Sequence, residues 1–137
     1  MGDRVRKVDY FYVMVSNSAG QGAKVLDGLA AHGVNLLAFS GFPSRGKGQL
    51  DLVPEESAAL VRAAKKLNLR LSKKKSGFLL EGKDRVGAMG KTLGKLAKAK
   101  INVTAMDAVV AGNGRFAAIF WVKPKYVAKT AKLLGAR

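Results

Sequence analysis

Two short polar turns, each with a glycine near its end, are the stretches of this sequence best suited to hold a ligand. They are Asn17-Ser18-Ala19-Gly20-Gln21 and Asp84-Arg85-Val86-Gly87-Ala88, and each directly precedes a stretch with helical periodicity. The first backbone N–H groups of a helix have no partner inside it, so they and the helix dipole favour a carboxylate or a phosphate. Glycine also lets a ligand approach the backbone closely. The alternative interpretation is a purely structural turn with an Asn or Asp cap.

The two turns belong to a repeat that aligns without a gap at an offset of 67 residues, residues 17–36 on residues 84–103. Self-similarity at a fixed offset indicates a duplicated structural unit. A unit of this length is too long for a solenoid repeat and predicts two small domains. The matched pairs include Gly20 with Gly87, Lys24 with Lys91, Leu29 with Leu96 and Asn35 with Asn102.

The periodicity of the apolar residues predicts the order βαββαβ, followed by the same order without its last strand. The first copy has strands over 8–15, 34–42, 50–53 and 69–72 and helices over 21–32 and 54–67. The second has strands over 78–82, 101–110 and 116–122 and helices over 88–99 and 124–134. We therefore expect an α+β fold of two ferredoxin-like βαββαβ units, residues 1–73 and 76–137, each an antiparallel sheet with helices on one face. Because the second unit lacks its last strand, one edge of its sheet needs cover from elsewhere.

The two copies differ where the first helix should end. Gly33 stands where a left-handed cap is expected, and Lys100 occupies the same position in the second copy. A residue other than glycine in the left-handed region costs about 1 kcal/mol. Either the second unit tolerates this conformation at Lys100, or its helix ends differently.

Residues for catalysis or metal binding are scarce. The chain has no Cys and a single His, His32, near a helix end, where the helix dipole stabilises a histidine. Gly46-Lys47-Gly48 lacks the spacing and the following Lys-Ser/Thr of a phosphate-binding loop. No Asp, Glu and His residues cluster as metal ligands would. We therefore expect no enzyme activity, no metal and no cofactor.

The net charge of +16 on 137 residues attracts polyanions, and basic residues outnumber acidic ones in both copies. Two helical faces carry lysines opposite their apolar residues, namely Lys91, Lys95 and Lys98 on the first and Lys125, Lys129 and Lys132 on the second. A solvated surface and a contact surface for nucleic-acid phosphates are the two interpretations. The aromatic motif by which a ferredoxin-like sheet reads RNA is not present.

The βαββαβ order, the turns and the helices that end in Gly-Val-Asn-Leu or Ile-Asn-Val together resemble a tandem of ACT domains. The usual turn of that family is Asp-x-Pro-Gly. Here Val86 replaces the proline, and in the first copy Asn17 and Ala19 replace the aspartate and the proline. The resemblance covers nearly the whole chain and is stronger in the second copy.

This resemblance implies a regulatory protein that binds a small molecule, most often an amino acid, at an interface between two such domains. It also implies a regulated enzyme partner. The ligand would contact the turn before the first helix and the start of the second strand. Those positions are Asp84, Arg85, Val86, Gly87, Ala88, Asn102 and Val103 in the second copy, and Asn17, Ser18, Ala19, Gly20, Gln21, Asn35 and Leu36 in the first. A basic nucleic-acid-binding protein on a similar fold is the alternative function.

The sheet strands offer large apolar side chains to both faces, as in Tyr10–Met14 and Phe116–Val122. Because helices cover only one face, the other face must also be buried, by the second unit or by another chain. We expect a compact pair of units that dimerises further. The chain has no apolar run of roughly 18–20 residues, no leader pattern and no Cys, so we expect a cytoplasmic protein without a membrane partner.

Overall fold

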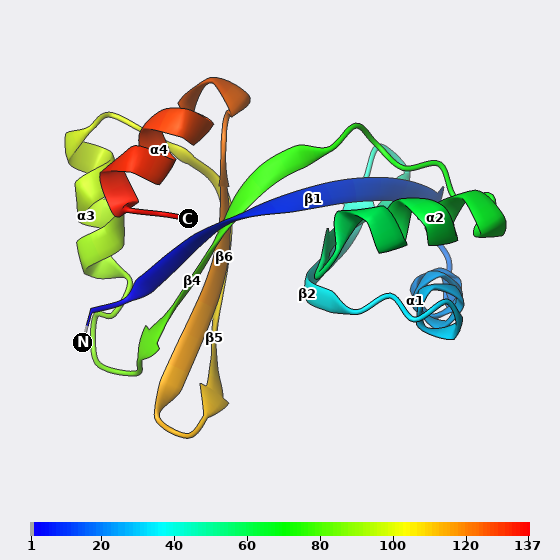
Figure 1. Ribbon diagram of the computed structural model, residues 1–137, viewed down its shortest axis with the longest axis horizontal. Coiled ribbons are helices and arrows are strands. Elements are labelled where there is room, and N and C mark those ends of the chain that lie inside the picture. Colours follow the sequence, from blue (N-terminus) through cyan, green and yellow to red (C-terminus); the bar gives the residue numbers. More distant parts are fainter. Residues whose placement is uncertain (1) are drawn as a thin grey trace. The chain divides into compact units, whose positions relative to one another are not determined.

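The computed structural model describes residues 2–137, which form two compact units (Figure 1). One unit is Asp9–Lys75, and the other joins the chain up to Val8 to Ser76–Arg137. The elements, in chain order, are β1 (Arg4–Ser16), α1 (Gln21–Ala31), β2 (Leu36–Ser44), β3 (Lys47–Pro54), α2 (Ser57–Leu67), β4 (Lys75–Lys83), α3 (Gly90–Lys98), β5 (Val103–Gly112), β6 (Arg115–Val122), a 3₁₀ helix η1 (Pro124–Tyr126) and α4 (Val127–Leu134).

The six strands are hydrogen-bonded in the order β2-β3-β1-β4-β6-β5. β3 pairs antiparallel with β1 and β2, and β6 pairs antiparallel with β4 and β5. The expected α+β fold of two ferredoxin-like units is thereby confirmed. β1 is shared: its first residues lie beside β4, and its later residues pair with β3.

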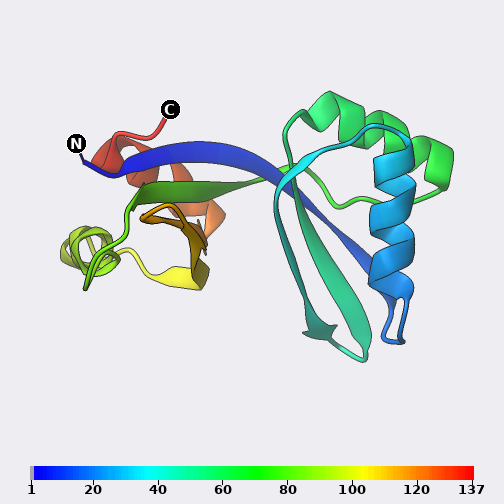
Figure 2. The ribbon, with the colours of Figure 1, turned by 90° about the horizontal axis from the view of Figure 1, so that it is seen from below.

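In the Asp9–Lys75 unit, α1 and α2 lie on the same side of the strands (Figure 2). Directly paired residues of β1 and β3 point to that side, as Phe11 does with Leu52 and Val13 with Leu50. They pack against buried residues of the two helices, among them Leu29 and Leu60, to form the core of this unit. The alternation of apolar residues along β1 follows from the period of two in a strand.

The second unit repeats this plan with larger side chains. Phe78 pairs with Phe120 across β4 and β6, and their rings stack with centroids 5.3 Å apart. Leu80 is completely buried beside them, and Leu96 of α3 packs onto the same cluster. Thr92 on α3 and Thr130 on α4 are buried among these apolar residues.

The N-terminal segment, residues 2–8, supplies the strand that the second unit lacks. Its part of β1 lies beside β4, at the sheet position that the last strand of a βαββαβ unit would fill. Val8 is buried, Val5 packs on the core of the second unit, and the N–H of Lys7 donates to the carbonyl of Arg137 (3.0 Å). The expected cover for the open edge therefore comes from the chain itself. This also places the N-terminal segment outside the first unit, in which the sequence-based division at 1–73 had included it.

Residues 69–72 and Lys100 are two places where the structure decides a sequence-based expectation. Residues 69–72 are not a strand, although the N–H of Ser72 donates to the carbonyl of Tyr12 (2.9 Å). The N–H of Tyr12 in turn donates to the hydroxyl of Ser72 (2.9 Å), so a side chain replaces the backbone carbonyl that a ladder needs. At the end of α3, Lys100 takes the left-handed conformation (φ +59°) that Gly33 takes after α1 (φ +72°).

Side chains on the sheet face away from the helices are also buried, among them Val53, Ile119 and Trp121. Within residues 2–137, no helix is both long and apolar enough to cross a membrane.

Candidate functional site

The turn over Asp84–Met89 is held by its own backbone. Gly87 has a positive φ of +74°, the left-handed region that favours glycine. The N–H of Ala88 donates to the carbonyl of Arg85 (3.2 Å), and the N–H of Gly90 donates to the carbonyl of Gly87 (3.0 Å). α3 begins at Gly90, two residues later than the sequence indicated. The N–H of Ala88 is therefore occupied, whereas those of Val86 and Gly87 donate no backbone bond within the described turn.

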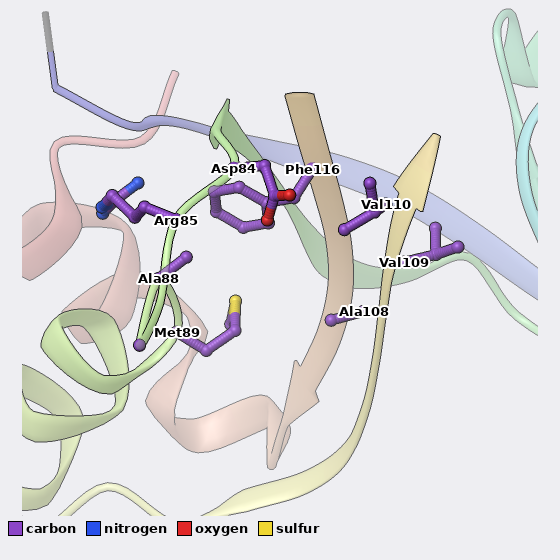
Figure 3. A pocket seen from close by; sticks show the side chains of 9 residues that line it. Asp84, Arg85, Ala88, Met89, Ala108, Val109, Val110 and Phe116 are labelled. Atoms are coloured by element: carbon purple, nitrogen blue, oxygen red, sulfur yellow. The ribbon is translucent and has the colours of Figure 1, made fainter. Parts of the chain in front are cut away.

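A pocket of about 330 Å³ opens between this turn and strand β5 (Figure 3). The turn contributes Asp84, Arg85, Gly87, Ala88 and Met89 to its lining. The opposite side consists of Ala108, Val109, Val110 and Phe116. Four of the five predicted turn residues therefore line one hollow. The fifth, Val86, is fully exposed.

The polar and apolar parts of the pocket are separate. The N–H of Asp84 donates to the carbonyl of Gly114 (2.8 Å), which fixes the turn against the β5–β6 hairpin. The Asp84 carboxylate and the Met89 thioether point into the space between turn and strand (Figure 3). Phe116 is buried at the base, while Val109 and Val110 on β5 are 62% and 56% exposed. The pocket thus offers one carboxylate beside an apolar wall.

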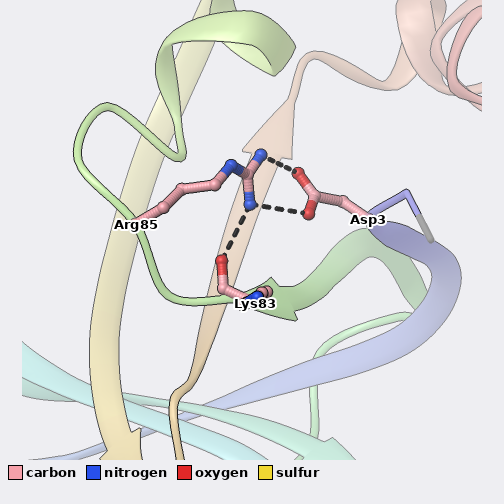
Figure 4. A network of polar contacts seen from close by, with 3 residues as sticks. All are labelled: Asp3, Lys83 and Arg85. Carbon is pink, nitrogen blue, oxygen red and sulfur yellow. Dashed lines mark hydrogen bonds and ion pairs between the residues drawn. The ribbon is translucent and has the colours of Figure 1, made fainter.

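Arg85 is held by three hydrogen bonds (Figure 4). Its Nη1 and Nη2 donate to the two carboxylate oxygens of Asp3 at 3.0 and 2.9 Å, and Nη1 also donates to the carbonyl of Lys83 at 2.8 Å. Its guanidinium lies 5.9 Å from the centre of the Phe116 ring. A bidentate pair of this kind fixes both partners in geometry as well as in charge.

The hydrogen bond from Arg85 is the main reason that the pKa of Asp3 lies below its usual value of 3.8, and the charges of Arg85, Lys91 and Arg115 lower it further against the effect of burial. A carboxyl with a lowered folded-state pKa stabilises the protein above its unfolded-state pKa. That contribution is lost as the pH falls below 3.8 through the folded-state pKa.

We therefore expect Asp3→Asn to lower the urea midpoint of the second unit at pH 7. The difference from the unchanged protein should shrink as the pH is lowered from 4 toward 2, since a growing fraction of Asp3 is then protonated in the folded as well as the unfolded state. Urea unfolding followed by Trp121 fluorescence at several pH values measures this. A difference that stays constant over that range would show that the ion pair does not act through charge.

Asn102 and Val103 do not line this pocket. They border a second hollow of about 380 Å³, together with Leu93, Leu96, Ala97, Lys100 and Ile101. The two parts of the predicted site in the second copy therefore lie in different hollows of the same unit. A small ligand in the turn pocket would meet groups like Asn102 and Val103 only if another domain supplied them.

The equivalent turn in the first unit is built differently. Gly20 again has a positive φ, of +89°, and the N–H of Gln21 donates to the carbonyl of Ser18 (3.4 Å). Asn17, Ser18 and Ala19 bring no charge to it. Asn35 is occupied by Glu55, to which its Nδ2 donates at 3.4 Å and from whose N–H its carbonyl accepts at 2.9 Å. Leu36 begins β2 and packs on the core.

His32 and Asp51, two further titratable residues, make hydrogen bonds within the fold. The Nδ1 of His32 lies 2.9 Å from the carbonyl of Gly28, one turn back along α1. Asp51 is buried on β3, which raises the pKa of its carboxyl, and Gln49 donates a hydrogen bond to it (2.9 Å). Among residues 2–137, no three His, Cys, Asp or Glu side chains are grouped so that they could hold a metal ion.

Comparison with solved structures places this fold. Protein BT0572 from Bacteroides thetaiotaomicron is similar to this chain, with a TM-score of 0.81 and 18% identity. The alignment covers 96% of this chain and 88% of BT0572. The ligand-free regulatory subunit of aspartate kinase from Thermus thermophilus matches 98% of this chain over 95% of its own, with a TM-score of 0.67 and 12% identity. Aspartate kinase from Clostridium acetobutylicum matches 97% of this chain over 33% of its own, with a TM-score of 0.58 and 17% identity.

The fold is ACT-like. At these identities the likeness shows the fold alone, and it agrees with the resemblance that the repeated turns indicated. No family model and no curated protein matches the sequence.

Several residues of the turn pocket were not foreseen from the sequence. The β5 wall of Ala108, Val109 and Val110 is one group, and Asp3 is another. Val110 carried a signal, because it lies two residues from Ala108 and so on the same face of the strand, beside its paired residue Phe116. Asp3 carried none, because its pairing with Arg85 joins residues 82 positions apart.

Proposed function

We propose that this protein is a regulatory protein without enzyme activity that binds a small molecule, an amino acid, at the pocket of the second ACT-like unit. The observation that carries the proposal is the pocket between the Asp84–Met89 turn and β5, which four of the five predicted turn residues line. The Asp84 carboxylate is suited to the ammonium group of the ligand. The N–H of Gly87, which donates no backbone bond within the turn, is suited to its carboxylate.

The ligand is proposed to lie at an interface between ACT-like domains. Asn102 and Val103 border a separate hollow, so equivalent groups of another domain would have to approach the turn pocket. This favours a homo-oligomer. Two of the similar structures are of aspartate kinase, a regulatory subunit in one case. By analogy an enzyme is the expected partner that the bound ligand would regulate. The Gly20 turn is proposed as a weaker site.

Thermal unfolding of the full chain with each of the twenty amino acids tests the proposal. A ligand at about 100 times its dissociation constant stabilises the folded state by about 2.7 kcal/mol, which such a scan detects. We expect Gly87→Val to abolish the response, since valine at a positive φ displaces the turn. Gly135→Val is the matched control, because Gly135 also has a positive φ (+64°) but ends α4, outside the pocket lining. A response that survives Gly87→Val would show that the ligand binds elsewhere.

Nucleic-acid binding is the second candidate, and one observation favours it. The six lysines of α3, η1 and α4 are all exposed, and these elements contain no acidic residue. They are Lys91, Lys95, Lys98, Lys125, Lys129 and Lys132. Binding to phosphates weakens steeply with salt, whereas binding of an amino acid at a backbone turn depends on salt much less. Replacing Lys95, Lys98 and Lys129 by Gln should leave the amino-acid response intact and weaken any binding of DNA or RNA.

A further inference from the structure

We infer that the ligand of the second unit is an amino acid with an aliphatic side chain, and that Asp3 sets this preference by keeping Arg85 away from the ligand. The inference rests on the proposed function, because it names the class of amino acid that the turn pocket takes. It stands on three features: the apolar wall, the neutralised arginine and the contrast with the first unit.

The wall of the pocket is apolar wherever a ligand side chain would lie. Ala88 and Phe116 are buried at the base, and Val109 and Val110 leave more than half of their surface in water. Exposed aliphatic side chains beside a hollow favour a ligand that covers them. At about 330 Å³, the pocket is about twice the roughly 150 Å³ of an apolar cavity that holds benzene. It has room for an aliphatic side chain together with the α-carbon groups.

The charge at the pocket does not suit an acidic side chain. Arg85 is the only cationic residue in the described lining, and both of its Nη atoms are bonded to Asp3. Its side chain points away from Val109 and Val110 (Figure 3). Asp84 has no ion pair among the described residues. The pocket therefore presents one free carboxylate, which matches a ligand ammonium and repels a second acidic group.

The position of Asp3 is built into the sheet. Gly82 on β4 lies so close to Asp3 that a Cβ at Gly82 would collide with the Asp3 carboxylate. The same Cβ would lie 3.1 Å from the Phe116 ring. The absence of a side chain at Gly82 thus makes room both for the group that holds Arg85 and for the ring at the base of the pocket.

The first unit shows the reverse arrangement. At the equivalent residue pair of its sheet, Val15 pairs with Gly48, whereas Gly82 pairs with Phe116 in the second unit. In the first unit the larger side chain of this pair is therefore Val15 on β1, and Gly48 stands where the second unit has the Phe116 ring. Asn17 and Ser18 replace Asp84 and Arg85. We expect aliphatic amino acids to bind with high affinity only in the second unit.

The experiment is a titration of the full chain with leucine, isoleucine, valine and methionine, and in parallel with aspartate, glutamate and lysine. The aliphatic amino acids should bind at least about tenfold more tightly than the charged ones. Val109→Ser with Val110→Ser changes only exposed side chains and should weaken leucine binding about tenfold. Tighter binding of a charged amino acid to the unchanged protein would overturn the inference and leave the proposed function standing. Binding of none of the twenty would overturn both.

The role of Asp3 is tested by Asp3→Asn, which removes the negative charge that neutralises Arg85. The ratio of glutamate to leucine affinity should rise about tenfold, because a free guanidinium attracts the acidic side chain. Glu81→Gln is the matched control, since Glu81 on β4 pairs with Arg4 on β1 (3.8 Å) but does not line the pocket. Adding Arg85→Gln to Asp3→Asn should return the ratio to that of the unchanged protein. An unchanged ratio in Asp3→Asn would overturn the role of Asp3.

Discussion

A chain that lacks residues 2–8 is expected to lose the stable fold of the Ser76–Arg137 unit while the Asp9–Lys75 unit stays folded. The deletion removes the strand beside β4, the buried Val8, the contact of Val5 with the core and the bond from Lys7 to Arg137. Burial of a valine contributes about 1.5–3 kcal/mol, and each lost hydrogen bond costs about 1 kcal/mol. The sum is comparable to the about 5–15 kcal/mol that keeps a whole domain folded.

Amide hydrogen exchange resolves the two units in one experiment. Protection should disappear along β4, β5 and β6 in the shortened chain and persist along β3 and α1. Removing only residues 2 and 3 is the control, because this shorter deletion eliminates the Asp3–Arg85 pair but keeps Arg4–Val8 beside β4. Equal loss of protection in both units would show that the N-terminal segment is not a part of the second unit alone.

The sequence predicted the duplicated fold because the signal for it is local. Each helix and strand of the repeat is specified by apolar residues a few positions apart, and the turn glycines recur at the same offset. The left-handed conformation of Lys100 was likewise one of two outcomes that the alignment with Gly33 left open. Features of this kind depend on neighbours in the chain and can be read from it.

Features that depend on distant pairing could not be read in this way. Residues 4–7 are Arg, Val, Arg and Lys, and so short and so basic a segment indicates a strand only when a partner edge is known. The partner, β4, comes about seventy residues later in the chain. The predicted strand at residues 69–72 was wrong for the same reason, because the hydroxyl of Ser72 accepts a hydrogen bond from the N–H of the distant Tyr12.

The candidate site divides along the same line. The turn of Asp84–Ala88 was predicted, because a glycine before a helix is a local pattern. The β5 wall and Asp3 were missed, because only the sheet brings them to the turn. Asn102 and Val103 were placed with the turn by the family resemblance, and the structure puts them in another hollow of the unit. A single sequence thus does not show which residues of separate strands the fold brings together in a site.

The two cores should respond separately to the loss of one side chain each. Leu52 and Leu80 are both completely buried, Leu52 in the core of the Asp9–Lys75 unit and Leu80 in that of the other. Replacing a buried leucine by alanine costs about 2–5 kcal/mol, because apolar contact is lost and a cavity remains. We expect each variant to lower the free energy of unfolding of its own unit by that amount.

Trp121 is the only tryptophan of the chain and lies on β6, so its fluorescence reports on the second unit. In urea, Leu80→Ala should shift the fluorescence midpoint strongly, whereas Leu52→Ala should shift the loss of circular dichroism with a smaller change in fluorescence. Leu133→Ala is the matched control, because Leu133 is 38% exposed on α4 and should change the free energy of unfolding by less than about 1 kcal/mol. If Leu52→Ala moved the fluorescence midpoint as far as Leu80→Ala does, the two cores would unfold as one cooperative unit, and the division of the chain at Val8 and Lys75 would have no energetic meaning.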